Sequence, residues 1–145
     1  MNAKCNVLKA AAIYFALVFG TGFALGTLRV LLMVPMVGAR TAELIESPLM
    51  LLVTIFAARW LDRHRWRDFE GSQRLAVGGI AVTMILLADL AVGVLLRGLS
   101  PMQVFISRDA VSGLVYYGLL AIFALMPWAI GWQRQATVRS KKRPG

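Results

Sequence analysis

The chain has 145 residues and a formal net charge of +9, and 59% of its residues are hydrophobic, with a mean hydropathy of +0.69. This composition excludes an ordinary soluble domain, because a chain of this size would leave much apolar surface in water. The single cysteine, Cys5, excludes an intramolecular disulfide and any paired-cysteine zinc or redox motif.

Charged residues interrupt the apolar sequence at intervals that leave room for four membrane-spanning helices of about 20 residues each. The first span is expected at residues 9–34 and the second at residues 43–61. The start of the chain resembles a signal peptide, since Lys4 and Lys9 precede apolar residues. The uncharged stretch 10–28 is too long for a signal-peptide core, so we expect a retained helix.

The third span is expected at residues 75–96 and the fourth at residues 110–132. The fourth span contains no charged side chain. Residues 137–145 are polar and basic, a composition typical of a disordered tail. The sequence therefore predicts an all-α fold, an integral membrane four-helix bundle that occupies residues 1–136 as a single domain.

The distribution of lysine and arginine among the predicted loops indicates the orientation, because positive residues near span ends stay on the cytoplasmic side. One side would carry twelve of the sixteen basic residues and the other side four. The twelve are Lys4, Lys9, Arg59, Arg63, Arg65, Arg67, Arg74, Arg134, Arg139, Lys141, Lys142 and Arg143. This bias predicts a multi-pass protein of the bacterial inner (cytoplasmic) membrane with both termini in the cytoplasm.

The positive net charge also raises nucleic-acid binding, but the basic residues concentrate at span ends and in the tail, where anionic lipid accounts for them. We therefore expect membrane lipids as partners, anionic on the cytoplasmic face, and no nucleic acid. Trp60 and Trp66 alternate with arginines, which favours a segment in the headgroup layer. A homodimer or a membrane-protein partner is a further candidate.

Asp89 is the only charged residue in the predicted third span of about 22 residues. An ionised carboxylate in hydrocarbon costs at least a few kcal/mol, so it needs a partner, a proton or a water-filled cavity. Each of these alternatives is a lead on function.

Distance along the helices places other polar side chains near the depth of Asp89. At a rise of 1.5 Å per residue, Glu46 lies about 20 Å and Asp89 about 22 Å from the inner ends of their spans. Tyr116 and Tyr117 lie at nearly the same level, and the apolar residues after Arg29 draw that arginine inward. The sequence predicts an intramembrane polar cluster of these five residues, in which Arg29 pairs with Glu46 or with Asp89.

Five further charged residues are expected at the outer interface, namely Arg40, Glu43, Arg97, Arg108 and Asp109. Asp109 would precede the first turn of the fourth span, where a carboxylate complements the helix dipole. Arg108 would lie among the headgroups. With a neighbouring arginine it could bind a phosphate, so a lipid-binding or lipid-modifying role is one alternative.

Gly22 and Gly26 form a GxxxG motif in the first span, which favours close helix approach. We expect this packing within the chain rather than in a dimer. Enzyme signatures such as G-x-S-x-G, the P-loop and H-E-x-x-H are absent from the sequence. His64 has no neighbouring histidine or cysteine, so we expect no metal and no cofactor.

Two functions from different classes follow from these observations. The favoured one is a structural or accessory membrane protein, not an enzyme, in which the charged cluster fixes the register of the helices. The alternative is a small oligomeric proton-coupled transporter or ion channel, in which Asp89 and Glu46 take up protons or cations.

Three strings resemble those of a group of small four-span bacterial inner-membrane proteins of unknown function. They are FGTGFALGTLRV at residues 19–30, AELIESP at residues 42–48 and RDAVSGLVY at residues 108–116. The resemblance implies a class and a compartment. It implies no activity, so no functional residue is transferred from it.

Overall fold

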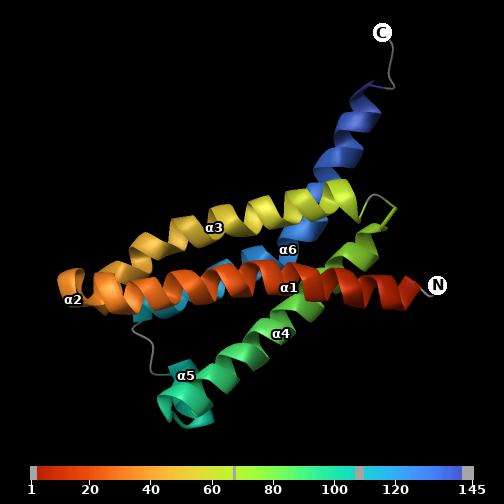
Figure 1. The fold of residues 1–145 in the computed structure, drawn as a ribbon. Coiled ribbons are helices and arrows are strands. Elements are labelled where there is room, and N and C mark those ends of the chain that lie inside the picture. The colour runs from red at the N-terminus through yellow and green to blue at the C-terminus, as the bar shows by residue number, and fades with distance from the viewer. Residues whose placement is uncertain (1–2, 67, 107–109, 142–145) are drawn as a thin grey trace.

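The computed structural model describes residues 3–66, 68–106 and 110–141, and every regular element in these ranges is helical. The elements are α1 (Ala3–Leu28), η1 (Arg29–Met33), α2 (Val34–Val37), α3 (Ala39–His64), α4 (Gly71–Arg97), α5 (Pro101–Ile106) and α6 (Ala110–Lys141) (Figure 1). The predicted all-α fold class is confirmed. Four candidate spans, long and apolar enough to cross a membrane, are also confirmed.

The helices extend beyond the predicted spans at several ends. α2 ends at Val37 and α3 begins at Ala39, so the loop expected between the first two spans shrinks to one residue. α6 continues to Lys141, so residues 137–141 of the expected tail are helical, and residues 142–145 of that tail lie outside the described residues. Extending a nucleated helix adds one hydrogen bond for each residue fixed, and glutamine, arginine and lysine are good helix formers.

A π-helical segment, η1, connects α1 to α2. The N–H of Val34 donates to the carbonyl of Arg29, five residues earlier. Pro35 accounts for the wider turn, because its ring lacks an N–H and would clash with the carbonyl four residues before it in an α-helix. Since η1 begins at Arg29, the change of pitch also affects where this side chain points.

Gly38 alone connects α2 to α3 and reverses the direction of the chain. Its φ of 82° and ψ of 159° form a conformation that is essentially restricted to glycine. The N–H of Gly38 donates to the carbonyl of Val34 at 3.0 Å, and its carbonyl accepts from the N–H of Ala42 at 3.1 Å. This reversal lays α3 back along α1.

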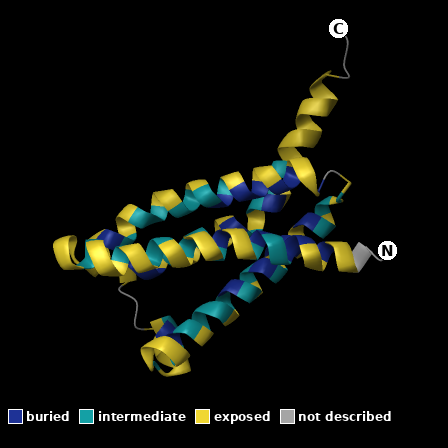
Figure 2. Cartoon of the chain, viewed as in Figure 1, coloured by how far each residue is buried: buried dark blue, intermediate teal, exposed yellow. Residues whose placement is uncertain are grey.

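Each long helix packs against two others. α1 contacts α3 and α4, and α6 contacts the same two helices. The buried residues concentrate where α3 ends and α4 begins, as the dark blue segments of Figure 2 show. Toward its C-terminus α4 diverges from α1 and α3 and reaches α5, which packs on it (Figure 1).

Tyr14 of α1 is the centre of the buried half. Its ring stacks on that of Phe123 with centroids 4.3 Å apart, and Trp66 packs edge-on against it at 5.7 Å. The Tyr14 hydroxyl donates to the carbonyl of Phe123 at 3.1 Å. Trp66 was expected in the headgroup layer but is fully buried. Its contact with Tyr14 covers the large apolar ring inside the protein. Trp60 is exposed.

Glycines permit the closest helix contacts. A Cβ on Gly22 would lie 2.9 Å from Cε of Met50, so this part of the GxxxG motif packs on α3 within the chain. The contact between α4 and α6 is tighter still. A Cβ on Gly78 would overlap the carbonyl oxygen of Ala124, and backbone atoms cannot rotate away as a side chain can.

We expect Gly78→Ala to lower the free energy of unfolding by about 1–3 kcal/mol, because α4 and α6 must separate to admit one methyl group. The matched control is Gly79→Ala, since a Cβ there meets nothing within 4 Å. Titration with SDS in mixed micelles, followed by circular dichroism, measures both variants. Equal stability of the two variants would contradict the contact.

Candidate functional site

Three groups of paired polar side chains lie among the apolar helices. The hairpin cluster, next to the reversal at Gly38, consists of Arg29, Glu43 and Glu46. The central pair, between α4 and α6, consists of Asp89 and Tyr116. The loop cluster, beside the connection from α3 to α4, consists of Asp62, Arg74 and Arg134.

In the hairpin cluster Arg29 lies between two carboxylates of α3. Its Nη1 is 3.0 Å from Oε1 of Glu43, and its Nε is 3.0 Å from Oε2 of Glu46. The Nε–H forms no hydrogen bond, so the contact with Glu46 is an ion pair alone. The two glutamates are three residues apart on a helix and therefore share one face. The sequence left Glu46 and Asp89 open as partners of Arg29; the structure pairs it with Glu46 and adds Glu43.

In the central pair the hydroxyl of Tyr116 donates to Oδ2 of Asp89 and joins α6 to α4. Among the described residues Asp89 forms no ion pair. Tyr117 points elsewhere, and its hydroxyl donates to the carbonyl of Phe105 in α5 at 3.5 Å. The five residues expected in one cluster thus separate: Arg29 pairs with Glu46, and Asp89 pairs with Tyr116. The ring of Tyr117 packs edge-on against that of Tyr116 with centroids 5.2 Å apart, while its hydroxyl reaches α5.

Arg40 and Arg97, which were also expected at the outer interface, lie at helix ends. Arg40 lies in the first turn of α3 and is exposed. Arg97 ends α4, where a positive charge complements the helix dipole, and Gly98 follows it in the left-handed conformation. Arg108 and Asp109 lie outside the described residues.

The loop cluster contains the most deeply buried charges of the described chain. Arg74 is 3% exposed and Asp62 is 7% exposed. Nη1 of Arg74 lies 2.5 Å from Oδ1 of Asp62, and Nη1 of Arg134 lies 3.5 Å from Oδ2 of the same carboxylate. The cluster therefore ties α3, α4 and α6 together around one aspartate.

Backbone groups complete the surroundings of Arg74. Its Nη2 donates to the carbonyl of Trp66 at 2.6 Å and its Nε to that of Phe69 at 3.1 Å. A Cβ on Gly131 would lie 2.6 Å from Cδ of Arg74, so the absent side chain of that glycine makes room for the arginine. The guanidinium of Arg74 thus binds both the carboxylate of Asp62 and the backbone of the loop between α3 and α4.

Sequence reasoning did not identify the loop cluster, because Arg74 was used only to mark the end of a span. A signal was present in the composition of the region. Asp62 is an acidic residue among the arginines at positions 59, 63, 65 and 67, and it closes a helix twelve residues before Arg74. An acidic residue between arginines at a span end favours such a pair.

The surface hollows formed by the described residues include the following two. One, of about 720 Å³, is apolar and is formed by α1 and α3 around Leu17, Leu52 and Phe56. The other, of about 440 Å³, is bordered by Arg74, Arg134 and other residues near the loop cluster. Asp89 and Glu46 line neither hollow. Within the described ranges no three histidine, cysteine or acidic side chains gather as a metal site would require.

Comparison with known proteins found no matching family model, no matching curated protein and no matching solved structure.

We expect Asp62→Asn to lower the free energy of unfolding by about 3–5 kcal/mol, because it leaves the buried guanidinium of Arg74 without a counter-charge. The neighbouring exposed Asp68 is the control, and Asp68→Asn should change stability by less than about 0.5 kcal/mol. SDS titration in mixed micelles measures both. A similar small effect for the two variants would show that the ion pair does not hold the helices.

Proposed function

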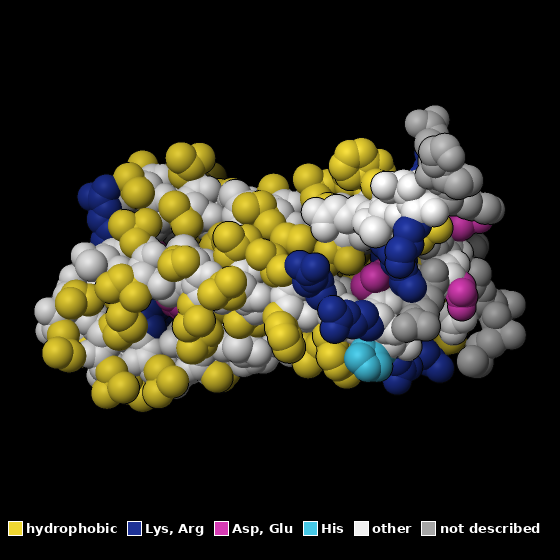
Figure 3. Space-filling view, turned by 90° about the horizontal axis from the view of Figure 1, so that it is seen from above, with side chains coloured by type: hydrophobic (Ala, Val, Ile, Leu, Met, Phe, Trp, Pro, Cys, Tyr) yellow, Lys and Arg dark blue, Asp and Glu magenta, His cyan; other side chains and the backbone are white. Residues whose placement is uncertain are grey.

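We propose that the chain is a multi-pass protein of the bacterial inner membrane, with both termini and the α3–α4 loop on the cytoplasmic side. α3 has 26 residues, about 39 Å at the helical rise, which exceeds the roughly 30 Å hydrocarbon core. On the face in Figure 3, apolar side chains cover a wide area and most lysine and arginine side chains gather toward one end. That end is the one expected to stay in the cytoplasm.

The single native cysteine allows a direct test of this orientation. Cys5 is exposed near the start of α1, and Met36, 84% exposed, lies at the opposite end beside the hairpin. In intact spheroplasts a membrane-impermeant maleimide should leave Cys5 unlabelled and should label the Cys5→Ser, Met36→Cys variant. Detergent permeabilisation, which should expose Cys5, is the control. The reverse labelling pattern would overturn the orientation.

Within that membrane we propose an accessory role, in which the protein is a fixed scaffold rather than a transport path. The observation that carries this proposal is the pairing of all three polar groups within the chain, with Glu46 and Asp89 lining neither hollow. Ion pairs of this kind fix helix register. The helices meanwhile leave large apolar side chains free for lipid or protein contact, such as Phe56, which is 76% exposed.

One observation favours the second candidate, a small oligomeric proton-coupled transporter. The partner of Asp89 is a neutral phenol, and a carboxylate hydrogen-bonded to a phenol can take up a proton without breaking an ion pair. In that case the central pair would be the site of proton uptake. Glu46, the other carboxylate expected to take part, is already occupied by Arg29.

Reconstitution into liposomes separates the two functions. An accessory protein should give no proton flux above that of empty liposomes. Asp89→Asn should weaken the hydrogen bond, because an amide oxygen is a poorer acceptor than a carboxylate, and Tyr116→Phe should remove it. Each variant should therefore be less stable, and the double variant should lose less than the sum. Flux through the wild type that Asp89→Asn abolishes without loss of folding would establish the transporter instead.

A further inference from the structure

The hollow beside the loop cluster has the composition of an anion site. It has a volume of about 440 Å³, and its lining includes Arg74, Arg134, Arg139 and Gln135. Its lining residues include three arginines and no carboxylate. Arginine donates through several N–H groups in a planar fork that fits phosphate oxygens.

The nearest carboxylate does not neutralise this hollow. Asp62 is held by Arg74 at 2.5 Å, and Arg134 is 3.5 Å from its other oxygen. Three arginines and one aspartate leave a net charge of +2. Glu70 is the N-cap residue just before α4, and its side chain accepts a hydrogen bond from the backbone of the first turn of that helix.

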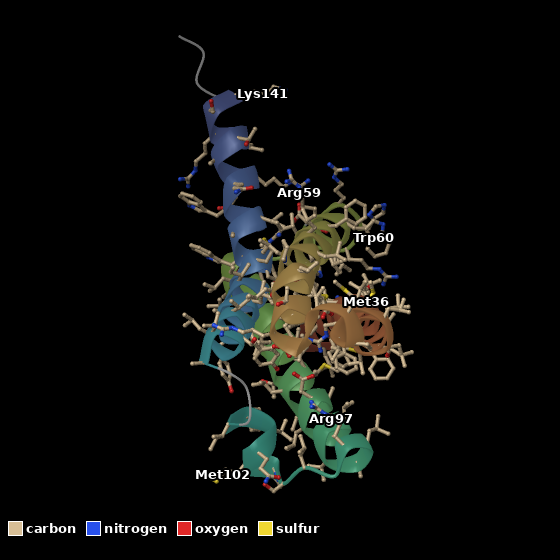
Figure 4. The ribbon with its side chains drawn as sticks, turned by 90° about the vertical axis from the view of Figure 1, so that its left-hand side faces the viewer. Met36, Arg59, Trp60, Arg97, Met102 and Lys141 are labelled. Atoms are coloured by element: carbon tan, nitrogen blue, oxygen red, sulfur yellow. The ribbon has the colours of Figure 1, made fainter. Side chains whose placement is uncertain are left out.

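The position of the hollow along the helices indicates that a lipid headgroup would supply the anion. Arg74 lies in the first turns of α4, and Arg134 follows the last tryptophan of α6, so the hollow lies where two apolar spans end. Trp128 and Trp132 stack with centroids 6.3 Å apart just before it, and tryptophan concentrates at the headgroup level. In Figure 4, α6 extends beyond the labelled Arg59 and Trp60 of α3 toward Lys141.

We propose that this hollow binds the headgroup phosphate of one anionic phospholipid of the cytoplasmic leaflet. Arg134 and Arg139 contact the phosphodiester, Gln135 contacts the polar part of the headgroup, and Phe69 and Val138 provide apolar contacts for the glycerol end of the chains. Basic hollows between transmembrane helices on the cytoplasmic side are suited to such headgroups. The assignment rests on the proposed membrane orientation and adds a defined lipid partner to it.

The test uses the full chain in neutral detergent micelles doped with phosphatidylglycerol or phosphatidylcholine, with native mass spectrometry to count the lipid retained. The wild type should retain one phosphatidylglycerol in preference to phosphatidylcholine. The R134Q/R139Q variant should bind phosphatidylglycerol on the order of 10- to 30-fold more weakly, because two charge contacts are lost. If that variant fails to fold, R139Q alone carries the test, since Arg139 is exposed.

The matched control is R63Q/R65Q, which removes the same charge from exposed positions at the same end of the molecule. It should retain phosphatidylglycerol as the wild type does. Equal loss in both double variants would mean a diffuse basic surface and would overturn the site. Competition by glycerol 3-phosphate at the same concentration as the lipid would assign the hollow to a soluble anion and would also overturn the proposal. None of these outcomes alters the maleimide or flux results.

Discussion

The ion pair between Asp62 and Arg74 is the interaction on which the packed half of the molecule depends. Both side chains are buried, and a charge in a low-dielectric interior is costly without its partner. Arg74 also holds the carbonyls of Trp66 and Phe69, so the loop that follows α3 is fixed by the same guanidinium. The loop in turn places Trp66 against Tyr14, which links charge pairing to the aromatic core.

The opposite end of the molecule is fixed mainly by backbone geometry. Pro35 widens the helix into a π turn, and Gly38 reverses the chain in a conformation that other residues rarely adopt. The ion pairs of Arg29 then join η1 to α3 just beyond the reversal. Backbone conformation and charge pairing thus act together on the same two segments, η1 and α3.

The position of each polar group along its helix follows from the sequence, but the direction in which its side chain points does not. Distance along a helix is fixed by the rise per residue, and the structure brings Arg29 to Glu46 and Asp89 to Tyr116. Direction around the helix axis depends on helix phase, which η1 changes at Arg29 itself. Successive side chains on a helix also point in different directions, so Tyr117, one residue from Tyr116, directs its hydroxyl to α5 instead.

The sequence by itself determined the helical class and the number of candidate spans, because apolar stretches of about 20 residues separated by charges have few other solutions. Only the tertiary structure decided which helices touch and which charges meet. The Gly78 contact with Ala124 and the pairing of Asp62 with Arg74 depend on helices approaching closely at particular angles. Such contacts join residues that are separated along the chain, and local composition does not indicate which of these residues meet in space.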